Sequence, residues 1–566
     1  MTRTWLRTPV QWQSTRVANP MFVHGLTDEE VAFIRSKWRN YLSADWDYSQ
    51  PTVEFFCAGI AWLLILNVIF RLRSRTSTTG SSSAPSWLDR LTAICRYTVA
   101  SQYRVKIFGW YSPPLAAIIG VAGMFTFIMA LMLAARPYFW KPNMGSMPIA
   151  NRTGWISIGI VPFVIAFSTK VNWVGMLTGT SHEKLQVFHR WSASIMYITS
   201  LVHTFVFIVM SIRQGQMEEN WRIGTFYWTG VAALVPQTWL MFMSWGIIRN
   251  KYYETFKKIH FVAALLFIFF LFIHCNWVLT SWHYFWATFA IYFLAFFTRI
   301  LRIFYNSLFG LAGSVESLPD GMIKLAIQTP SRVRWAPGQH VFVRFLSLGI
   351  HNFSSHPFTI VSIPGEAGRM ELIFAVKGGI TKKLADLARD KDCQTLAGGS
   401  GVTFTLSILL DFLQRVKVSE LKCKHIEFVL AVKSNDSILW LEDQLTAAKE
   451  TGITVKVHVT QSNVPSISNL KEHGDLENDS CNGDIDVKQS LDVACGRPNL
   501  PAIIHKACRT NSGTMAIADS FLYDVRNAVA DCQPAIADGY GQCRDLFFHT
   551  ENYGFVTSFT VTNRLD

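Results

Sequence analysis

Two pairs of histidines with the same spacing lie in two strongly apolar segments of the chain. His189 and His203 are 14 residues apart, and so are His260 and His274. Fourteen helical steps of about 100° bring the second residue to within about 40° of the first, roughly 21 Å further along the axis. Two such helices side by side would hold two imidazoles at each of two depths. Imidazoles paired in this way are ligands for a haem iron.

A single histidine in an apolar helix is most often a core residue whose ring is hydrogen-bonded, and that alternative applies to each histidine taken alone. It does not explain two pairs with identical spacing, and ionisable residues inside a membrane are functional candidates. We therefore predict that two b-type haems are bound, with their metal ligands being His189, His203, His260 and His274.

The composition is that of a membrane protein. Half of the residues are hydrophobic, 16% are charged, and the apolar residues concentrate in the first 300 positions. The formal charge of +13 comes largely from basic residues beside apolar segments, as in a positive-inside bias, and this argues against a nucleic-acid partner. Ten cysteines without a CxxC pair are expected to be mostly reduced.

About seven membrane spans are predicted, at Pro51–Phe70, Leu115–Ala134, Trp155–Thr169, Val187–Met210, Phe226–Ile248, Ile259–Leu279 and Tyr284–Ile300.

Seven spans would place an N-terminal segment, residues 1–50, outside the cell and everything after a haem-binding membrane domain, residues 51–304, in the cytoplasm. The basic loop Arg71–Lys106 fits a cytoplasmic position. His189 and His260 would then lie towards the cytoplasm. Asn151 begins a glycosylation sequon in a predicted outer loop, which is a weak signal.

The pattern changes to α/β after about residue 315. Short strands between Pro and Gly turns predict a small antiparallel barrel over residues 315–395. A Gly-rich turn, Gly398–Thr403, leads into a helix and can bring backbone N–H groups to a phosphate, although such a turn alone is a weak signal. A βαβ pattern follows, which predicts a nucleotide-binding α/β domain over residues 396–566. Residues 461–490 are polar and are predicted to be a disordered insertion.

Several motifs resemble one family. They are His189-Arg190-Trp191 with His203, Tyr253-Glu254 with His260 and His274, Trp335-Ala336-Pro337-Gly338-Gln339-His340, and His356-Pro357-Phe358-Thr359. Together they resemble the fungal ferric/cupric reductases, the metalloreductase branch of the ferric reductase and NADPH oxidase superfamily. The resemblance implies a membrane domain followed by a ferredoxin-reductase-like module. It also implies electron transfer from cytosolic NADPH through FAD and two b-type haems to extracellular ferric or cupric chelates.

The same resemblance implies which residues bind the nucleotides. His356 would meet the FAD pyrophosphate, Phe358 would pack on the isoalloxazine, and Thr359 would hydrogen-bond near flavin N5. Gly379 and Thr381 resemble a second pyrophosphate turn, and Phe555 resembles the aromatic residue that covers the flavin. The complete predicted set is His356, Pro357, Phe358, Thr359, Gly379, Thr381, Gly398, Gly399, Ser400, Gly401, Val402, Thr403 and Phe555. No catalytic residue is predicted beyond this electron-transfer chain.

The family's partners are the lipid bilayer and extracellular ferric or cupric chelates, with an iron-uptake permease and oxidase as candidates. The expected location is the plasma membrane, and the vacuolar membrane is the alternative.

A superoxide-producing NADPH oxidase is an alternative function. In the oxidases the second histidine pair is typically one residue closer, whereas both spacings here are 14, which favours metal reduction.

Two elements of the family pattern are missing. A Gly-Pro-Tyr-Gly loop and a strand normally precede the Gly-rich turn, but only Lys382–Leu396 lies there. The usual Cys-Gly-Pro is absent after Ala516-Ile517-Ala518. Both gaps fall between well-matched stretches, which suggests missing coding segments. We therefore predict retained haem binding, a truncated barrel with weakened FAD binding, and low or no NADPH-dependent turnover. A non-catalytic haem membrane protein is thus a third interpretation.

Overall fold

The structure, a computed structural model, describes most of the chain outside its N-terminal segment. The described residues are 27–29, 45–76, 87–105, 110–134, 138–139, 147–276, 278, 280–307, 311–318, 321–345, 355–363, 368–376, 378–389, 402–417, 425–432, 438, 440–460, 491–510, 513–519, 524–538, 543–550 and 557–561. The predicted insertion 461–490, most of the N-terminal segment and Phe555 lie outside them. The chain divides into two compact units, Met1–Thr79 with Ala116–Phe297 and Gly80–Leu115 with Thr298–Asp566.

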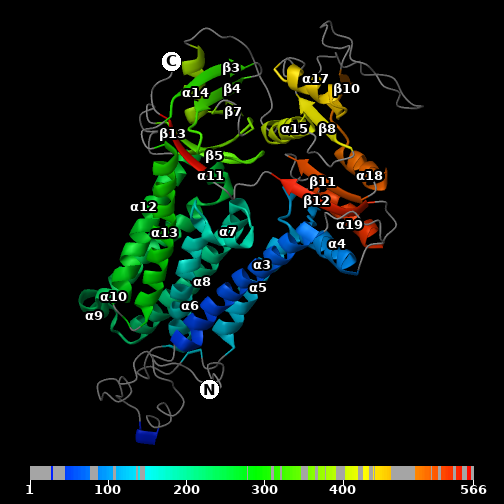
Figure 1. The fold of residues 1–566 in the computed structure, drawn as a ribbon. Coiled ribbons are helices and arrows are strands. Elements are labelled where there is room, and N and C mark those ends of the chain that lie inside the picture. Colours follow the sequence, from blue (N-terminus) through cyan, green and yellow to red (C-terminus); the bar gives the residue numbers. More distant parts are fainter. Residues whose placement is uncertain are drawn as a thin grey trace, which may run out of the picture. The chain divides into compact units, whose positions relative to one another are not determined.

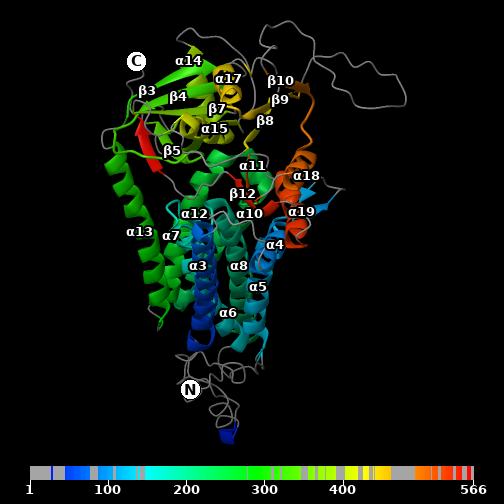
Figure 2. The ribbon, with the colours of Figure 1, turned by 45° about the vertical axis from the view of Figure 1, so that its right-hand side comes forward.

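The first unit is a helical bundle. Figure 1 shows α9 and α10 at one side of it and α3 and α5 at the other, and Figure 2, from a second direction, shows α13 at the left side and α5 at the right. Its elements are η3 (Asp45–Ser49), α3 (Gln50–Thr76), α5 (Leu115–Leu133), α6 (Pro148–Ser168), α7 (Trp173–Thr178), α8 (His182–Arg213), α9 (Met217–Ile223), α10 (Thr225–Met243), α11 (Gly246–Lys251), α12 (Tyr253–Cys275) and α13 (Ser281–Ser307).

Six of the described helices are long and apolar enough to cross a bilayer. These spans are Asp47–Leu72, Leu115–Leu133, Pro148–Ser168, Lys184–Arg213, Thr255–Cys275 and Ser281–Asn306. The third of them, α6, lies in the middle of the bundle and buries Ile156 and Ile160 completely. The other five leave large apolar side chains exposed, which suits contact with lipid. The predicted multi-pass helical membrane domain is confirmed.

The predicted fifth span, α10, is less apolar, but the geometry requires it to cross as well. His189 on α8 lies beside His260 on α12, and His203 lies beside His274. The helices α8 and α12 therefore run in the same direction, so the chain must return between them. α10 is the only helix between them with enough length, since 19 residues rise about 28 Å. With α10 added to the six candidate spans, the number would be seven, and this number stays a prediction.

The predicted outer loop around Asn151 is not a loop. Asn151 lies in the first turn of α6, and its side chain is 1% exposed. Pro148 starts the helix here, because a proline at the first helical position removes no hydrogen bond. The prediction of a loop at this position is therefore wrong, and the burial of Asn151 argues against the weak glycosylation signal.

The second unit contains two small sheets that share a core. β3 (Gly313–Leu318), β4 (Met322–Gln328) and β7 (Arg369–Ala375) are antiparallel, as are β5 (His340–Phe345) and β6 (His356–Thr359). Alternate residues such as Leu325 and Val343 point into the common core. One strand was not expected: β13 (Thr557–Val561), from the C-terminal tail, pairs in parallel with β5.

The predicted βαβ pattern is present in the rest of this unit. β8 (Glu427–Val432), α17 (Glu442–Glu450) and β9 (Thr454–Val459) form it, and β10 (Asp492–Cys495) extends the parallel sheet in the order β10-β9-β8. The remaining elements are α14 (Gly379–Arg389), α15 (Val402–Lys417), α18 (Leu500–Thr510), β11 (Gly513–Asp519), α19 (Asp524–Asp538) and β12 (Cys543–Thr550).

β11 and β12 form a separate parallel pair, and no described strand joins them to β8. In an α/β domain of this kind the first strand lies in the middle of the sheet and leads into the Gly-rich turn. The sequence predicts that the segment for that strand is missing before residue 398, and residues 390–401 lie outside the described part of the chain. The separation of these two sheets among the described strands is consistent with that prediction, and the gap stays a prediction.

The predicted basic loop contains a helix, α4 (Trp87–Ala100), followed by a short antiparallel pair, β1 (Arg104–Val105) with β2 (Trp110–Tyr111). α4 packs on α19 and β12, where Ala93 joins their apolar core. The Arg96 Nη1 atom donates to the Leu546 carbonyl oxygen at 3.2 Å. This part of the loop is thus a structural element of the second unit.

Most described cysteines are free thiols, as expected: Cys57, Cys95, Cys275, Cys508, Cys532 and Cys543. Cys495 is the exception and is disulfide-bonded. Cys508, Cys532 and Cys543 are buried in one cluster beside α4. A hydrogen bond between the first two raises the pKa of the Cys508 thiol and lowers the pKa of Cys532, because it stabilises a thiolate at Cys532.

Candidate functional site

The structure brings the four predicted histidines into two pairs inside the helical bundle. The ring centroids of His189 and His260 are 6.5 Å apart, and those of His203 and His274 are 6.1 Å apart. α8 supplies one ring of each pair and α12 supplies the other. The two levels lie roughly 21 Å apart along the helices, as the 14-residue spacing requires.

These distances fit one metal ion between the two rings of a pair. A nitrogen–metal bond of about 2.0 Å, with roughly 1.1 Å from ring centroid to nitrogen, places two opposed imidazoles with centroids about 6.2 Å apart. Both observed separations lie close to this value. The residues therefore fit two bis-histidine haem sites, and the assignment of the four ligands stays a prediction.

Backbone carbonyls orient three of the four rings. The Nδ1 atom of His189 is 2.9 Å from the Val164 oxygen. The Nδ1 atom of His203 is 2.7 Å from the Ala150 oxygen, and that of His274 is 2.8 Å from the Phe226 oxygen. A carbonyl can only accept, so each Nδ1 carries the proton and each Nε2 keeps its lone pair for a metal. His260 Nδ1 is buried and has no hydrogen-bond partner among the described residues.

Two glycines make room for the rings of one level. A Cβ atom on Gly154 of α6 would lie 2.6 Å from His203 Nδ1, and one on Gly230 of α10 would lie 2.9 Å from His274 Cε1. Both distances are shorter than any van der Waals contact allows. α6 and α10 thus approach the histidine-bearing helices closely because a side chain is missing at these two positions.

Between the two levels, polar side chains of three helices are hydrogen-bonded. Ser157 Oγ of α6 lies 2.6 Å from Thr199 Oγ1 of α8. Ser200 Oγ donates to Ser157 Oγ, and Gln237 Nε2 of α10 donates to Ser200 Oγ, both at 3.3 Å. Such interhelical bonds contribute about 0.6 kcal/mol each in a membrane. They hold α8 in one rotation about its axis, and that rotation aims both of its histidines.

The predicted flavin motif is the edge strand β6. Phe358 is 7% exposed and its ring centroid lies 4.3 Å from that of Phe374, so the ring lies in the core of the sheets. His356 and Thr359 are half-buried and Pro357 is exposed. β6 pairs with β5 so that Thr359 lies opposite His340. The strand is formed as expected, and the contacts of its residues with flavin stay predictions.

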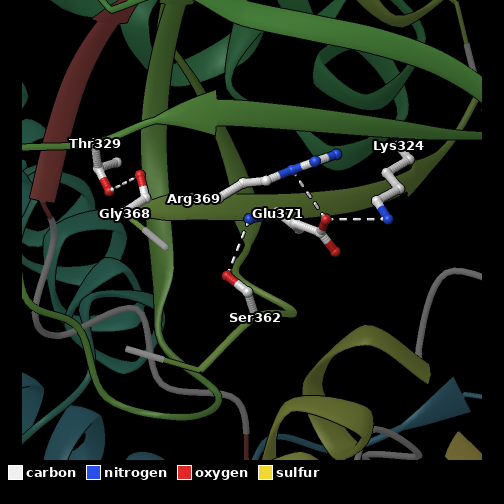
Figure 3. A network of polar contacts seen from close by, with 6 residues as sticks. All are labelled: Lys324, Thr329, Ser362, Gly368, Arg369 and Glu371. Atoms are coloured by element: carbon white, nitrogen blue, oxygen red, sulfur yellow. Dashed lines mark hydrogen bonds and ion pairs between the residues drawn. The ribbon is translucent and has the colours of Figure 1, made fainter. Parts of the chain in front are cut away.

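A polar network fixes the corner that follows β6 (Figure 3). Glu371 Oε1 contacts Lys324 Nζ at 3.0 Å and Arg369 Nε at 3.2 Å, while the Glu371 backbone N–H donates to Ser362 Oγ. Thr329 is bonded to the Gly368 oxygen through both its N–H and its hydroxyl. Ser362 also accepts, at its backbone oxygen, from Trp335 Nε1 at 2.7 Å. The corner therefore holds the Trp335 motif and the end of the β6 segment together.

The turn at Gly338 connects the barrel strands to α15. Gly338 has a φ of +73°, and its N–H donates to Ser407 Oγ of α15 at 2.6 Å. A Cβ atom there would lie 2.7 Å from the Phe404 ring. The contact needs glycine both for its backbone conformation and for the close approach.

The substitution Gly338→Ala is expected to destabilise this region by about 1–3 kcal/mol or more, because strained φ is combined with a clash against an aromatic ring. The measurement is limited proteolysis across a temperature series, read at peptides from residues 321–345. Gly452→Ala is the matched control, since Gly452 has a φ of +84° but nothing within 4 Å of its Cβ position. Equal sensitivity of the two variants would contradict the role of the Phe404 contact.

The remaining predicted nucleotide residues lie at two helix N-termini. Gly379 starts α14, and Thr381 Oγ1 donates to the Gly378 oxygen at 2.8 Å. Val402 and the buried Thr403 start α15. Helix N-termini suit phosphate groups. The turn residues Gly398, Gly399, Ser400 and Gly401 lie outside the described residues, as does Phe555.

Three family models match successive parts of the chain. A ferric reductase like transmembrane component matches residues 153–271, an FAD-binding domain matches residues 310–424, and a ferric reductase NAD binding domain matches residues 394–530. The first range contains most of α6, all of α7 to α11, and three of the four histidines, with His274 just outside it. The chain thus contains a ferric reductase membrane component followed by FAD- and NAD-binding domains.

Known proteins that are similar to this chain are named as ferric or ferric/cupric reductases. The probable cell surface ferric reductase kap2 of Aspergillus oryzae is 31% identical over 61% of this chain, which spans about half (52%) of that relative. Ferric/cupric reductase transmembrane component 7 of Saccharomyces cerevisiae is 23% identical over 94% of this chain and 98% of its own length. Ferric/cupric reductase transmembrane component 1 of Candida albicans is 23% identical over 73% of this chain and 58% of its own length.

The match to component 7 also bears on the missing segments. It extends over 618 aligned positions, more than the 566 residues of this chain. The relative therefore has segments without a counterpart here, which agrees with internal gaps. Taken together, the three family matches and these relatives show that the chain is similar to ferric reductases over most of its length.

Proposed function

We propose that this chain is a transmembrane metalloreductase that passes electrons from cytosolic NADPH through FAD and two b-type haems to ferric or cupric chelates outside. The observation that carries this proposal is the pair of histidine levels between α8 and α12. They lie in the same chain as FAD- and NAD-binding domains. The names of the relatives support ferric and cupric substrates.

When bound, FAD converts a hydride into single electrons, and iron held by two imidazoles exchanges one electron without an open position for a ligand. The residues of this chain supply the positions for these groups. The carbonyls of Val164, Ala150 and Phe226 hold the Nδ1–H groups of three histidines, so that their Nε2 atoms keep a lone pair for a metal. Since no open coordination position is implied, the metal substrate needs only to approach the outer edge of the site.

The proposed orientation places the N-terminus outside and the C-terminal half in the cytoplasm. A chain that crosses the membrane seven times has its N-terminus on one side of the membrane and its C-terminal half on the other. Basic residues at the His189 and His260 end, in the last turn of α11 and the first turns of α12, support a cytoplasmic position for that end: Arg249, Lys251, Lys257 and Lys258. The plasma membrane is proposed as the location, with an iron-uptake permease and oxidase as partners.

A second candidate is a non-catalytic haem membrane protein. The observation that favours it is the lack, among the described strands, of one that joins β8 to β11. The central strand of such a sheet positions the phosphate-binding turn, so its loss should weaken NADPH binding strongly. Haem binding would not be affected, because the four histidines belong to the other unit.

The test compares this chain with a restored chain, in which the two missing segments are supplied from the corresponding segments of component 7. Membranes containing the restored chain are expected to reduce ferric and cupric chelates with NADPH. The unrestored chain is expected to show the same haem spectrum with dithionite but little or no reduction with NADPH. The measurement is anaerobic chelate reduction followed together with the haem spectrum.

Two outcomes would contradict the proposal. Superoxide formation by the restored chain without chelate reduction would support the oxidase alternative. A restored chain that binds NADPH and FAD but never reduces its haem with NADPH would support the non-catalytic alternative.

A further inference from the structure

The helix α4, which belongs to the second unit, has one face packed on α18, α19 and β12 and another, apolar face that is exposed. Ala93 is 3% exposed in the core formed with α18, α19 and β12. Arg96 binds the Leu546 carbonyl oxygen on the same side. This face fixes the helix to the nucleotide-binding part of the chain.

The opposite face is exposed and uncharged. Trp87 is 72% exposed, Leu91 is 50% exposed and Ile94 is 52% exposed. At about 100° per residue, these three and Thr98 fall within an arc of about 60°, on the side opposite to Ala93. No charged residue of α4 falls in this arc. A tryptophan and two large aliphatic residues together on a helix surface indicate a partner that removes them from water.

We propose that this face lies on the lipid surface of the membrane, with Trp87, Leu91 and Ile94 at the boundary between headgroups and acyl chains. The first reason is chain connectivity. Only fourteen residues separate Leu72, the end of one candidate span, from Trp87, and fourteen more separate Ala100 from Leu115, where the next span begins. Fourteen residues reach at most about 50 Å even when fully extended, so both ends of the loop keep α4 near the bilayer.

The second reason is charge. The loop that carries α4 has a single acidic residue, Asp89, and seven basic ones: Arg71, Arg73, Arg75, Arg90, Arg96, Arg104 and Lys106. Basic segments beside membrane spans are attracted to the anionic lipids of the cytoplasmic leaflet. Tryptophan is enriched at this depth because one end of its ring is apolar and the other donates a hydrogen bond. Charge and apolar surface thus indicate the same partner.

As a consequence, α4 would attach the second unit to the membrane surface. α4 is held by α19 and β12 on one side and by lipid on the other, so the nucleotide-binding part is attached to the bilayer surface at a site separate from its covalent connection through α13. This inference does not depend on the proposed function. An inactive chain would be attached in the same way.

The test uses the full chain in nanodiscs of phosphatidylcholine and phosphatidylserine that contain a phospholipid with a photoactivatable group near the top of its acyl chain. After illumination, mass spectrometry identifies the labelled residues, and labelling of the α5 span serves as the internal positive control. We expect label on Trp87, Leu91 and Ile94. The variant Ile94→Glu should lose this label several-fold, because a carboxylate does not enter the interface.

Tyr97→Glu is the matched control, since Tyr97 is 39% exposed on the same helix but lies outside the arc. It should keep the label. Hydrogen exchange of α19, unchanged in both variants, would show that α4 remains docked. The proposal is overturned if α4 carries no label while α5 does, if Ile94→Glu keeps its label, or if the face is cross-linked to a second copy of the chain instead.

Discussion

Replacing His203 or His274 with leucine is expected to halve the haem content of the purified chain, from two haems to one. Each residue supplies one of the two imidazoles at its level, where the ring centroids are 6.1 Å apart. An iron that keeps a single protein ligand is lost easily during purification. The other level lies roughly 21 Å away, so its haem should remain. The pyridine haemochrome assay, expressed per chain, gives the measurement.

The matched control is His283→Leu, because His283 is an exposed histidine on the neighbouring helix α13 and belongs to neither pair. It should retain both haems. His189→Leu and His260→Leu should each remove the haem of their own level and leave the haem at the His203 and His274 level in place. A His203→Leu chain that still carries two haems would show that the pair is not a ligand set.

The second large effect is expected from adding one methyl group at Gly154 or Gly230. The new Cβ atom of Gly154→Ala would lie 2.6 Å from His203 Nδ1, and that of Gly230→Ala would lie 2.9 Å from His274 Cε1. In each case an imidazole ring must move away from its position, and a displacement of this size is enough to disrupt ligand geometry. We expect loss of the haem at this level with the other haem retained, read from the same assay.

Gly59→Ala and Gly123→Ala are suitable controls. Both glycines lie in membrane helices of the same unit, and nothing lies within 4 Å of either Cβ position. Alanine should be neutral or slightly stabilising there, since it favours the helix by about 1 kcal/mol over glycine. If all four variants lost haem equally, the effect would belong to the bundle in general and not to the histidine pockets.

The histidine pairing could be predicted from the sequence because it depends on helix geometry alone. A spacing of 14 residues fixes the direction of the second ring once a helix is assumed. Two equal spacings then define two levels without knowledge of any other contact. The βαβ unit around β8 and β9 was predictable for a similar reason, since its apolar periods and turns are local.

The surroundings of the histidines could not be predicted, because they come from other helices. The carbonyls of Val164, Ala150 and Phe226 are backbone atoms and leave no trace in the side-chain pattern. Gly154 and Gly230 do leave a signal, a glycine inside an apolar helix, but the sequence does not say which ring it faces. The position of Asn151 was misjudged because the polar start of α6 resembles a loop when its burial is unknown.

The least predictable parts are the contacts between distant segments. The pairing of β13 with β5 joins residues more than 200 positions apart, and α4 reaches its core on α19 from the other end of the chain. No local pattern encodes either contact. The gap before residue 398 was visible as a length too short for two strands. The separation of the described parallel strands into two sheets could be seen only from the strand pairing.

If each histidine pair holds a haem, two imidazoles fill both axial positions of its iron and make the ferric haem low-spin. Electron paramagnetic resonance of the purified, oxidised chain tests it most directly. We expect two low-spin ferric haem signals, one of which disappears in His203→Leu while the other is unchanged. High-spin haem in the unsubstituted chain, or no haem at all, would contradict it.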